Sequence, residues 1–178
     1  MPPWPWIEHT FNFDYPVAKF PEIVERLRGT PARVVVLLEG LRPELLVRRP
    51  DQGWSIQENV GHLTDIHSLM FTRLDELLAG AAVLTAADMD NRRTHAANHN
   101  ARPIVDVLAK LRAARARFVA RLEACAAADW SRTALHPRLN RPMRLVDHAL
   151  FFAEHDDYHL ARISELRRML DEDRPAGS

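Results

Sequence analysis

Residues 55–79 carry an apolar pattern that a helix can bury on one side. The segment opens with Ser55-Ile56-Gln57-Glu58, a capping box in which the serine hydroxyl accepts a hydrogen bond from the amide of the fourth residue. Gly80 follows as a residue that suits a left-handed helix end. The sequence therefore predicts a long amphipathic helix here. Its apolar positions recur at helical spacing: Ile56, Val60, Leu63, Met70, Leu74 and Leu77.

Other stretches of the chain carry the same helical period. Thr30-Pro31 pairs a capping residue with a proline at the first helical position, so we expect a helix that begins at Thr30. Apolar stripes at helical spacing also run over residues 103–127 and 145–170. The chain is therefore expected to form about four long helices and to belong to the all-α class.

The connections between these helices differ in length and composition. Residues 80–102 are rich in Asp, Asn and His, and residues 129–142 contain two prolines. Neither connection holds an alternating apolar run long enough to predict a sheet, although the longer one has room for a short helix. A connection as long as 80–102 can return along the bundle, so that the helices on either side of it run parallel. The predicted architecture is a four-helix bundle with one long crossover.

The 178 residues fit one domain with an appendage at each end. Residues 1–20 combine prolines with aromatic side chains, which favours an extended arm packed on a core. Residues 21–171 are expected to form the helical domain, and residues 172–178 a polar tail. The arm's apolar side chains would be hard to hide on an isolated arm, so we expect a homodimer. The side chains in question are Trp4, Trp6 and Phe11.

The charge balance argues against a nucleic-acid partner. The chain has 24 basic and 24 acidic residues and a formal net charge of zero, so it lacks the overall field that draws proteins to polyanions. Four arginines do cluster, but their helical spacing favours a solvated helix face. They are Arg112, Arg115, Arg117 and Arg121.

Membrane and redox features are also sparse. No window approaches the ~18 apolar residues of a membrane span, and the first residues lack the basic and apolar regions of a signal peptide. The single cysteine, Cys125, excludes a disulfide within this chain and fits a reducing compartment. We therefore expect no membrane partner and a cytoplasmic location.

His155 and His159 lie four residues apart in the last predicted helix. Residues at this spacing stack on one face, which here also carries Phe152 and Ile163. A buried imidazole pair needs partners for its nitrogens, and one divalent cation can satisfy both rings. The pair taken alone is explained equally well by two hydrogen-bonded core histidines.

A third ligand would have to come from another part of the chain. Spacing alone leaves three candidates, which are His62, His67 and His148. A rival pair, His95 and His99, lies in the polar 80–102 connection, where a surface position is favoured.

Two motifs resemble those of the DinB-like (YfiT-like) family of four-helix metalloenzymes. Trp54-Ser55-Ile56-Gln57-Glu58-Asn59-Val60-Gly61-His62-Leu63 matches W-S-x-x-E-x-x-x-H-L, and His155-Asp156-Asp157-Tyr158-His159 matches H-x-x-x-H. The similarity runs from about Thr30 to Ile163. In the family these motifs supply three metal ligands, so the resemblance implies that His62, His155 and His159 are the ligands here. It also implies an up-down-down-up bundle, in agreement with the long crossover.

Three neutral histidines would leave coordination positions of the ion open, an arrangement typical of catalytic metal. Zinc and nickel are the expected ions, with iron and manganese as alternatives. Asp65, three residues after His62, is the candidate for orienting a ligand imidazole or acting as a general base. Glu58 is assigned to the capping box and Trp54 to packing of the helix start.

The resemblance implies a metal-dependent enzyme, and some family members look like transferases that use low-molecular-weight thiols. The expected substrate is a small anionic or thiol-bearing molecule, and the expected reaction is hydrolysis or thiol transfer. The alternative is a non-catalytic metal-binding stress-response protein in which the ion braces the bundle.

Overall fold

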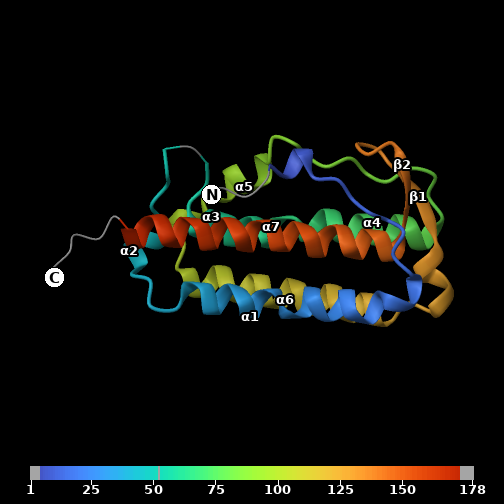
Figure 1. Ribbon diagram of the computed structural model, residues 1–178, viewed down its shortest axis with the longest axis horizontal. Helices are drawn as coiled ribbons and strands as arrows, with labels where there is room; N and C mark the ends of the chain where they lie inside the picture. Colours follow the sequence, from blue (N-terminus) through green and yellow to red (C-terminus); the bar gives the residue numbers. More distant parts are fainter. Residues whose placement is uncertain (1–4, 52, 173–178) are drawn as a thin grey trace.

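The computed structural model describes residues 5–51 and 53–172, so Trp4 and most of the predicted polar tail lie outside the described residues. Long helical rods run side by side along the length of the molecule (Figure 1). α3 and α4 run in the same direction as α6 and opposite to α1 and α7, which confirms the all-α, up-down-down-up topology (Figure 1). No helix in the described ranges is both long and apolar enough to cross a bilayer. The rods are α1 (Phe20–Leu38), α3 (Ile56–Asp65) with α4 (His67–Ala79), α6 (Ile104–Glu123) and α7 (Leu145–Glu172).

Helix α1 begins at Phe20 rather than at the predicted Thr30. Pro31 lies inside the helix, where a proline lacks the amide that would bond the carbonyl of Leu27. The guanidinium of Arg115 supplies the missing donor, because its Nη1 lies 3.3 Å from that carbonyl oxygen. The prediction was wrong because a residue from another helix compensates for the proline, and only the folded chain brings that residue near.

The best-marked predicted helix becomes two helices, α3 and α4, which meet at Ile66. Ser55 closes the capping box, since its hydroxyl accepts from the Glu58 amide and its own amide donates to the Glu58 carboxylate. Gly80 ends α4 in the left-handed conformation, with a φ of 74°. The junction is slight, because the amide of Ile66 still donates to the carbonyl of His62. The predicted start and end are thus confirmed.

The connection between α4 and α6 returns along the outside of the bundle and carries one short helix, α5 (Arg92–Ala97) (Figure 1). A 3-10 turn at His99–Ala101 follows and packs on α3. This contact is close because Gly61 has no side chain: a Cβ there would lie 2.2 Å from Cγ of His99. The crossover is therefore held against the helix that carries His62.

The segment predicted as a loop over residues 129–142 contains part of a two-stranded sheet that the sequence analysis did not predict. β1 (Thr133–His136) pairs antiparallel with β2 (Arg141–Arg144), with Ala134 opposite Met143. Both of these side chains are buried against the end of the bundle. Neither four-residue strand alternates strictly between polar and apolar residue types, which is why the prediction was wrong.

The N-terminal arm lies against α7 of the same chain. Phe11 and Phe13 are buried in the core, and the Trp6 ring packs edge-on against Phe151 with 5.2 Å between ring centroids. Phe11 and Phe13 are thus covered by their own chain, whereas Ile7 stays exposed. The homodimer stays a prediction: Phe11 is buried within the chain and Trp6 is partly buried, but Trp4 lies outside the described residues.

A layer of polar side chains crosses the middle of the bundle between two apolar clusters. One cluster fills the end near the β-hairpin, and the other fills the end near the short helix α2 (Pro43–Leu46). Between them Arg115 donates through both terminal nitrogens to the two carboxylate oxygens of Asp156. The Nε of Arg115 lies 3.1 Å from Nε2 of His67.

Burial of Arg115 corrects the prediction that it lies on a solvated helix face. The side chains of Arg115 and Asp156 are 2% and 0% exposed, so this ion pair belongs to the interior. Arg112, Arg117 and Arg121 do lie exposed, as predicted. Helical spacing alone could not separate one inward-facing arginine from three outward-facing ones, because the acid that neutralises it lies on α7.

Candidate metal centre

Three imidazole rings converge in the polar layer. His62 comes from α3, while His155 and His159 come from successive turns of α7. One ring nitrogen of each lies within 4.8 Å of those of the other two, and the Nε2 atoms of His62 and His155 are 3.4 Å apart. All three side chains are buried. The fold therefore brings together the three histidines that the resemblance named.

Asn59 fixes the orientation of the His159 ring. Its Oδ1 lies 2.9 Å from Nδ1 of His159, and its Nδ2 donates to the carbonyl of Ser55. Because the amide oxygen can only accept, Nδ1 of His159 carries the proton. The lone pair of that ring is then on Nε2, the nitrogen left for a metal ion.

Thr94 holds His62 in a similar way from the crossover connection. The hydroxyl oxygen of Thr94 lies 2.9 Å from Nδ1 of His62, which leaves Nε2 of His62 to face His155. The Nδ1 of His155 is buried with no hydrogen-bond partner among the described residues. No sequence signal pointed to Thr94, because it lies 32 positions from His62 in a segment with no apolar pattern.

Burial keeps the three rings neutral. The loss of hydration lowers the pKa of His62 to about 4 and lowers the pKa values of His155 and His159 well below the ordinary value. The neighbouring rings of the cluster disfavour protonation further. Each ring therefore has a free lone pair at neutral pH, as metal ligation requires.

The donor set fits a divalent metal ion. Two nitrogens bound at about 2.05 Å to a tetrahedral ion lie about 3.3 Å apart, close to the 3.4 Å between the Nε2 atoms of His62 and His155. Neutral imidazole nitrogens suit borderline ions such as zinc. Within the described part of the chain, no carboxylate or thiol joins the cluster.

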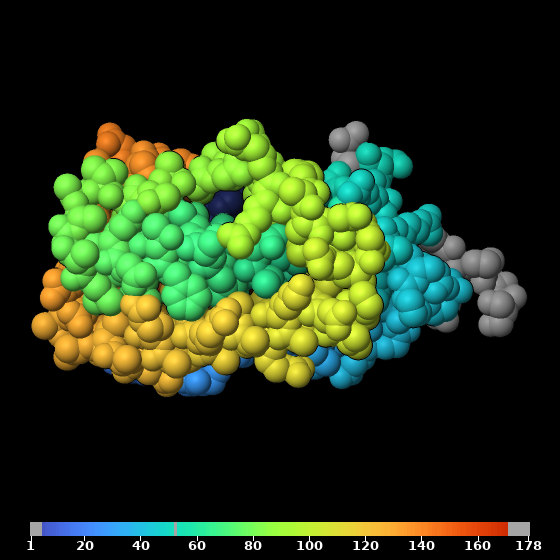
Figure 2. Space-filling model, turned by 180° about the vertical axis from the view of Figure 1, so that it is seen from behind, coloured from blue at the N-terminus to red at the C-terminus, as the bar shows by residue number. Residues whose placement is uncertain are grey.

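A cavity of about 690 Å³ opens onto the three rings, a size typical of small-molecule sites. Two tryptophans flank the rings, with the Trp54 centroid 4.8 Å from His62 and the Trp6 centroid 5.0 Å from His155. Trp54 was predicted to pack the start of the helix. The structure shows that it also lines the site. Figure 2 shows an opening beside the crossover connection, with dark-blue atoms of the N-terminal arm visible at its bottom.

The DinB superfamily model matches residues 26–163 of the chain. The chain belongs to this family. A Geobacillus kaustophilus (strain HTA426) protein named "putative metal-dependent hydrolase" is 27% identical over 150 residues, which cover 83% of each chain. The solved structure of YfiT from Bacillus subtilis, described as a probable metal-dependent hydrolase with an unusual four-helix bundle topology, matches with a TM-score of 0.79. That match covers 92% of this chain and 94% of YfiT at 20% identity, and it confirms the fold.

In this DinB-family chain, Asp65 binds His99 rather than a ligand histidine. Its Oδ2 lies 2.8 Å from Nε2 of His99. His99 was predicted to lie on the surface, but it is buried. Thr94 has the orienting contact that we had expected of Asp65. Asp65 and His62 do line a second, smaller cavity of about 250 Å³, so the assignment of Asp65 as a general base stays a prediction.

The two alternative third ligands lie elsewhere in the DinB-family bundle. His67 is engaged by Arg115 in the polar layer, and His148 donates from Nε2 to the carbonyl of Met70 at 3.1 Å. Both are buried, so an inward-facing position alone did not distinguish them from His62. His95 is exposed, as predicted.

Proposed function

We propose that His62, His155 and His159 hold one divalent metal ion and that the protein is a metal-dependent hydrolase of small molecules. The contact between Asn59 and His159 carries the proposal, because it turns the free lone pair of His159 toward the other two rings. The descriptions of the two relatives, a "putative metal-dependent hydrolase" and "a probable metal-dependent hydrolase", support the same chemistry. Zinc and nickel are the ions we expect, with iron and manganese as alternatives.

The chain's own residues divide the work at this site. The three histidines hold the ion, while Asn59 and Thr94 keep two of the rings in the ligating orientation. When bound, such an ion supplies Lewis-acid chemistry, by which an oxygen of the substrate or of water becomes more reactive. Asp65 is our candidate for taking up a proton, because it shares the smaller cavity with His62.

A catalytic ion explains the site better than a structural one. A structural ion is normally closed off by its ligands, whereas the three rings here form part of the wall of a cavity. Apolar clusters on both sides of the polar layer also hold the helices together. We therefore expect the protein to stay folded when the metal is removed.

The test is a screen for hydrolysis by protein purified without a histidine tag and loaded with zinc or nickel. Esters, amides and phosphate esters are offered with and without a low-molecular-weight thiol, and His155→Ala serves as the control. We expect a rate that is lost on chelation, restored by metal and independent of thiol. A rate that requires the thiol would replace hydrolysis with thiol transfer.

The non-catalytic alternative has its own signature. If no substrate gives a rate above that of His155→Ala, and chelation sharply lowers the melting temperature, the ion braces the bundle. The protein would then be a metal-binding stress-response protein.

A further inference from the structure

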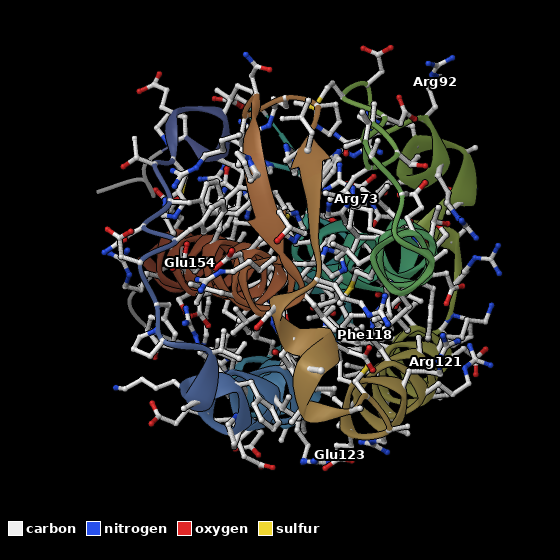
Figure 3. The ribbon with its side chains drawn as sticks, turned by 90° about the vertical axis from the view of Figure 1, so that its right-hand side faces the viewer. Arg73, Arg92, Phe118, Arg121, Glu123 and Glu154 are labelled. Carbon is white, nitrogen blue, oxygen red and sulfur yellow. The ribbon has the colours of Figure 1, made fainter. Side chains whose placement is uncertain are left out.

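The cavity has a second polar end, away from the three histidines. Arg73 of α4, His136 of β1 and Arg138 of the hairpin turn line this end. Figure 3 shows Arg73 in the interior behind the hairpin, whereas Arg92 and Arg121 extend outward from the molecule. None of these three residues has a role in the proposed metal site.

Arg73 is a buried charge that forms no ion pair within the described residues. It is 1% exposed, and its Nε donates to the carbonyl of Thr85 at 2.9 Å. Burial lowers its pKa to about 10, so the guanidinium is still protonated at neutral pH. Glu76 is the acid that favours this charge most, but its carboxylate is bound to the amide and hydroxyl of Thr85.

His136 cannot satisfy both of its neighbours. Its Nδ1 lies 3.1 Å from the amide nitrogen of Leu139, and its Nε2 lies 3.1 Å from Nη1 of Arg73. Both neighbours are donors, so each requires a lone pair on the ring. Burial and the charge of Arg73 lower the pKa of His136 to about 4, and the neutral ring has a lone pair on only one nitrogen. Either the Leu139 amide or the Arg73 guanidinium therefore lacks an acceptor on this ring.

Arg138 adds a second unsatisfied cation. Its Nη2 is buried with no hydrogen-bond partner among the described residues, and its Nη1 lies 3.4 Å from the carbonyl oxygen of Ile7. Burial lowers the pKa of Arg138 as well. A buried donor without an acceptor is costly, and a ligand that accepts from it would remove this cost.

The other charges that line the cavity are already paired. Arg162 binds Glu165, and Asp88 binds Arg92. Asp88 is the only carboxylate residue among the described residues of the cavity wall. The end formed by Arg73 and Arg138 therefore carries positive charge that no wall residue neutralises.

We propose that Arg73, Arg138 and His136 bind an oxyanion, a carboxylate or phosphate group, at the end of the cavity away from the three histidines. Such a group presents lone pairs to the unsatisfied N–H donors and neutralises the two guanidinium groups. The inference rests on the proposed function only in taking this anion to be part of the substrate.

The position of this subsite also indicates the shape of the substrate. Arg73 follows His62 by eleven positions, so their Cα atoms are separated by roughly 16 Å along the helix axis, and the Arg73 side chain leans back toward His62. Apolar side chains line the cavity between the two ends; they are Ile66, Leu69, Phe151 and Phe152. The substrate is thus a molecule with an anion at one end, an apolar body, and the reacting bond at the other end.

The experiment is calorimetric titration of the full chain after its metal has been removed, so that an anion cannot bind to the ion instead. The probes are benzoate, phenyl phosphate and the neutral benzyl alcohol. We expect at least one of the two anions to bind about tenfold or more tightly than the alcohol, in keeping with charge-assisted hydrogen bonds. The tighter of the two anions identifies the oxyanion as a carboxylate or a phosphate.

Two variants and a matched control assign the binding to these residues. Arg138→Gln should weaken anion binding about tenfold, and its half-exposed position makes the substitution compatible with folding. Arg73→Lys keeps the charge but loses the planar guanidinium, so it should also weaken binding. Arg121→Gln, at an exposed arginine that pairs with Asp75 outside the cavity, should bind the anions as the unmodified chain does.

Three results would overturn the subsite: equal affinity for the alcohol and the anions, unchanged anion affinity in Arg138→Gln, or anion binding that appears only after metal loading. Failure of the hydrolase proposal is separate. His155→Ala, which should lack the metal, should still bind the anions as tightly as the metal-free unmodified chain.

Discussion

The Oδ1 atom of Asn59 and the Nδ1 atom of His159 lie 2.9 Å apart, and this contact determines which nitrogen of His159 faces the other two histidines. Asn59 comes three residues before His62 on the same helix, so one helical turn provides both a ligand and the residue that orients another ligand. The resemblance motif leaves this position unspecified.

Asn59→Ala should therefore weaken metal binding by about 10- to 100-fold, as loss of a residue that orients a metal ligand usually does. Asn59→Asp should restore much of the affinity, because a carboxylate oxygen also accepts from Nδ1–H of His159. Competition against a zinc-chelating dye measures both affinities. Equal affinity in Asn59→Ala and the unmodified chain would show that the ring does not need this contact.

Each of His62→Ala, His155→Ala and His159→Ala should abolish stoichiometric metal binding, since two imidazoles hold the ion far more weakly than three. His95→Ala is the matched control, because His95 is exposed and outside the cluster. Elemental analysis of protein purified without a histidine tag gives the metal content. Metal retained by all three single variants would refute the site.

The sequence predicted the helices whose signals are local. The capping box at Ser55 and the glycine at position 80 mark helix ends through their own backbone chemistry, and the structure confirms both. The start of α1 could not be read locally, because Pro31 is tolerated through a hydrogen bond from Arg115 on a distant helix. Arg115 was predicted to lie on the surface for a related reason. Asp156, the acid that neutralises it, lies on another helix far away in the sequence.

The candidate site divides in the same way. The resemblance selected His62 over His67 and His148, and the structure brings His62 together with the α7 pair. Thr94 comes from the crossover connection, and the arginine end of the cavity combines α4 with the β-hairpin. These segments meet only through tertiary packing, so no sequence spacing could predict their contacts. His136 gave no signal in the sequence, because its significance lies in its neighbours Leu139 and Arg73.

Asp156→Asn should lower the free energy of unfolding by about 3–5 kcal/mol, because it leaves Arg115 as an uncompensated buried charge. Asp157→Asn is the control at the next position: Asp157 pairs with Arg26 and Arg33 at a partly exposed site, where we expect about 1 kcal/mol or less. Urea denaturation of the metal-free proteins measures both. Similar losses of unfolding free energy in the two variants would show that the buried pair of Arg115 and Asp156 stabilises the fold no more than the partly exposed one.

Acid should destabilise the metal-free protein between about pH 6.5 and pH 3. Burial lowers the pKa of His148 to about 3 in the folded chain, so as the pH falls below 6.5 the unfolded state binds a proton that the folded state does not. Stability is therefore present above this window and is lost as the pH falls through it. One such histidine contributes up to about 1.4 kcal/mol per pH unit.

His148→Phe should make this loss less steep, because phenylalanine fits the apolar surroundings of Phe118 and Phe152 and does not titrate. Urea midpoints at pH 7, 6 and 5 for both proteins give the slopes. An unchanged slope would assign the acid sensitivity to the other buried histidines, which include His67, whose pKa burial also lowers to about 3.

Gly61→Ala gives a prediction whose sign depends on one contact. In an open helix interior, alanine is more favourable than glycine by about 1 kcal/mol. Here the added Cβ would lie 2.2 Å from Cγ of His99, whose ring is bound to Asp65 and whose carbonyl accepts from Gln57. Gly61→Ala should therefore destabilise the protein by about 1–3 kcal/mol, as overpacking of a core does.

In a His99→Ala background the same substitution should instead stabilise it, and a double-mutant cycle by urea denaturation measures the reversal. If Gly61→Ala had the same effect with and without the His99 ring, the close packing of the crossover connection on α3 would be disproved.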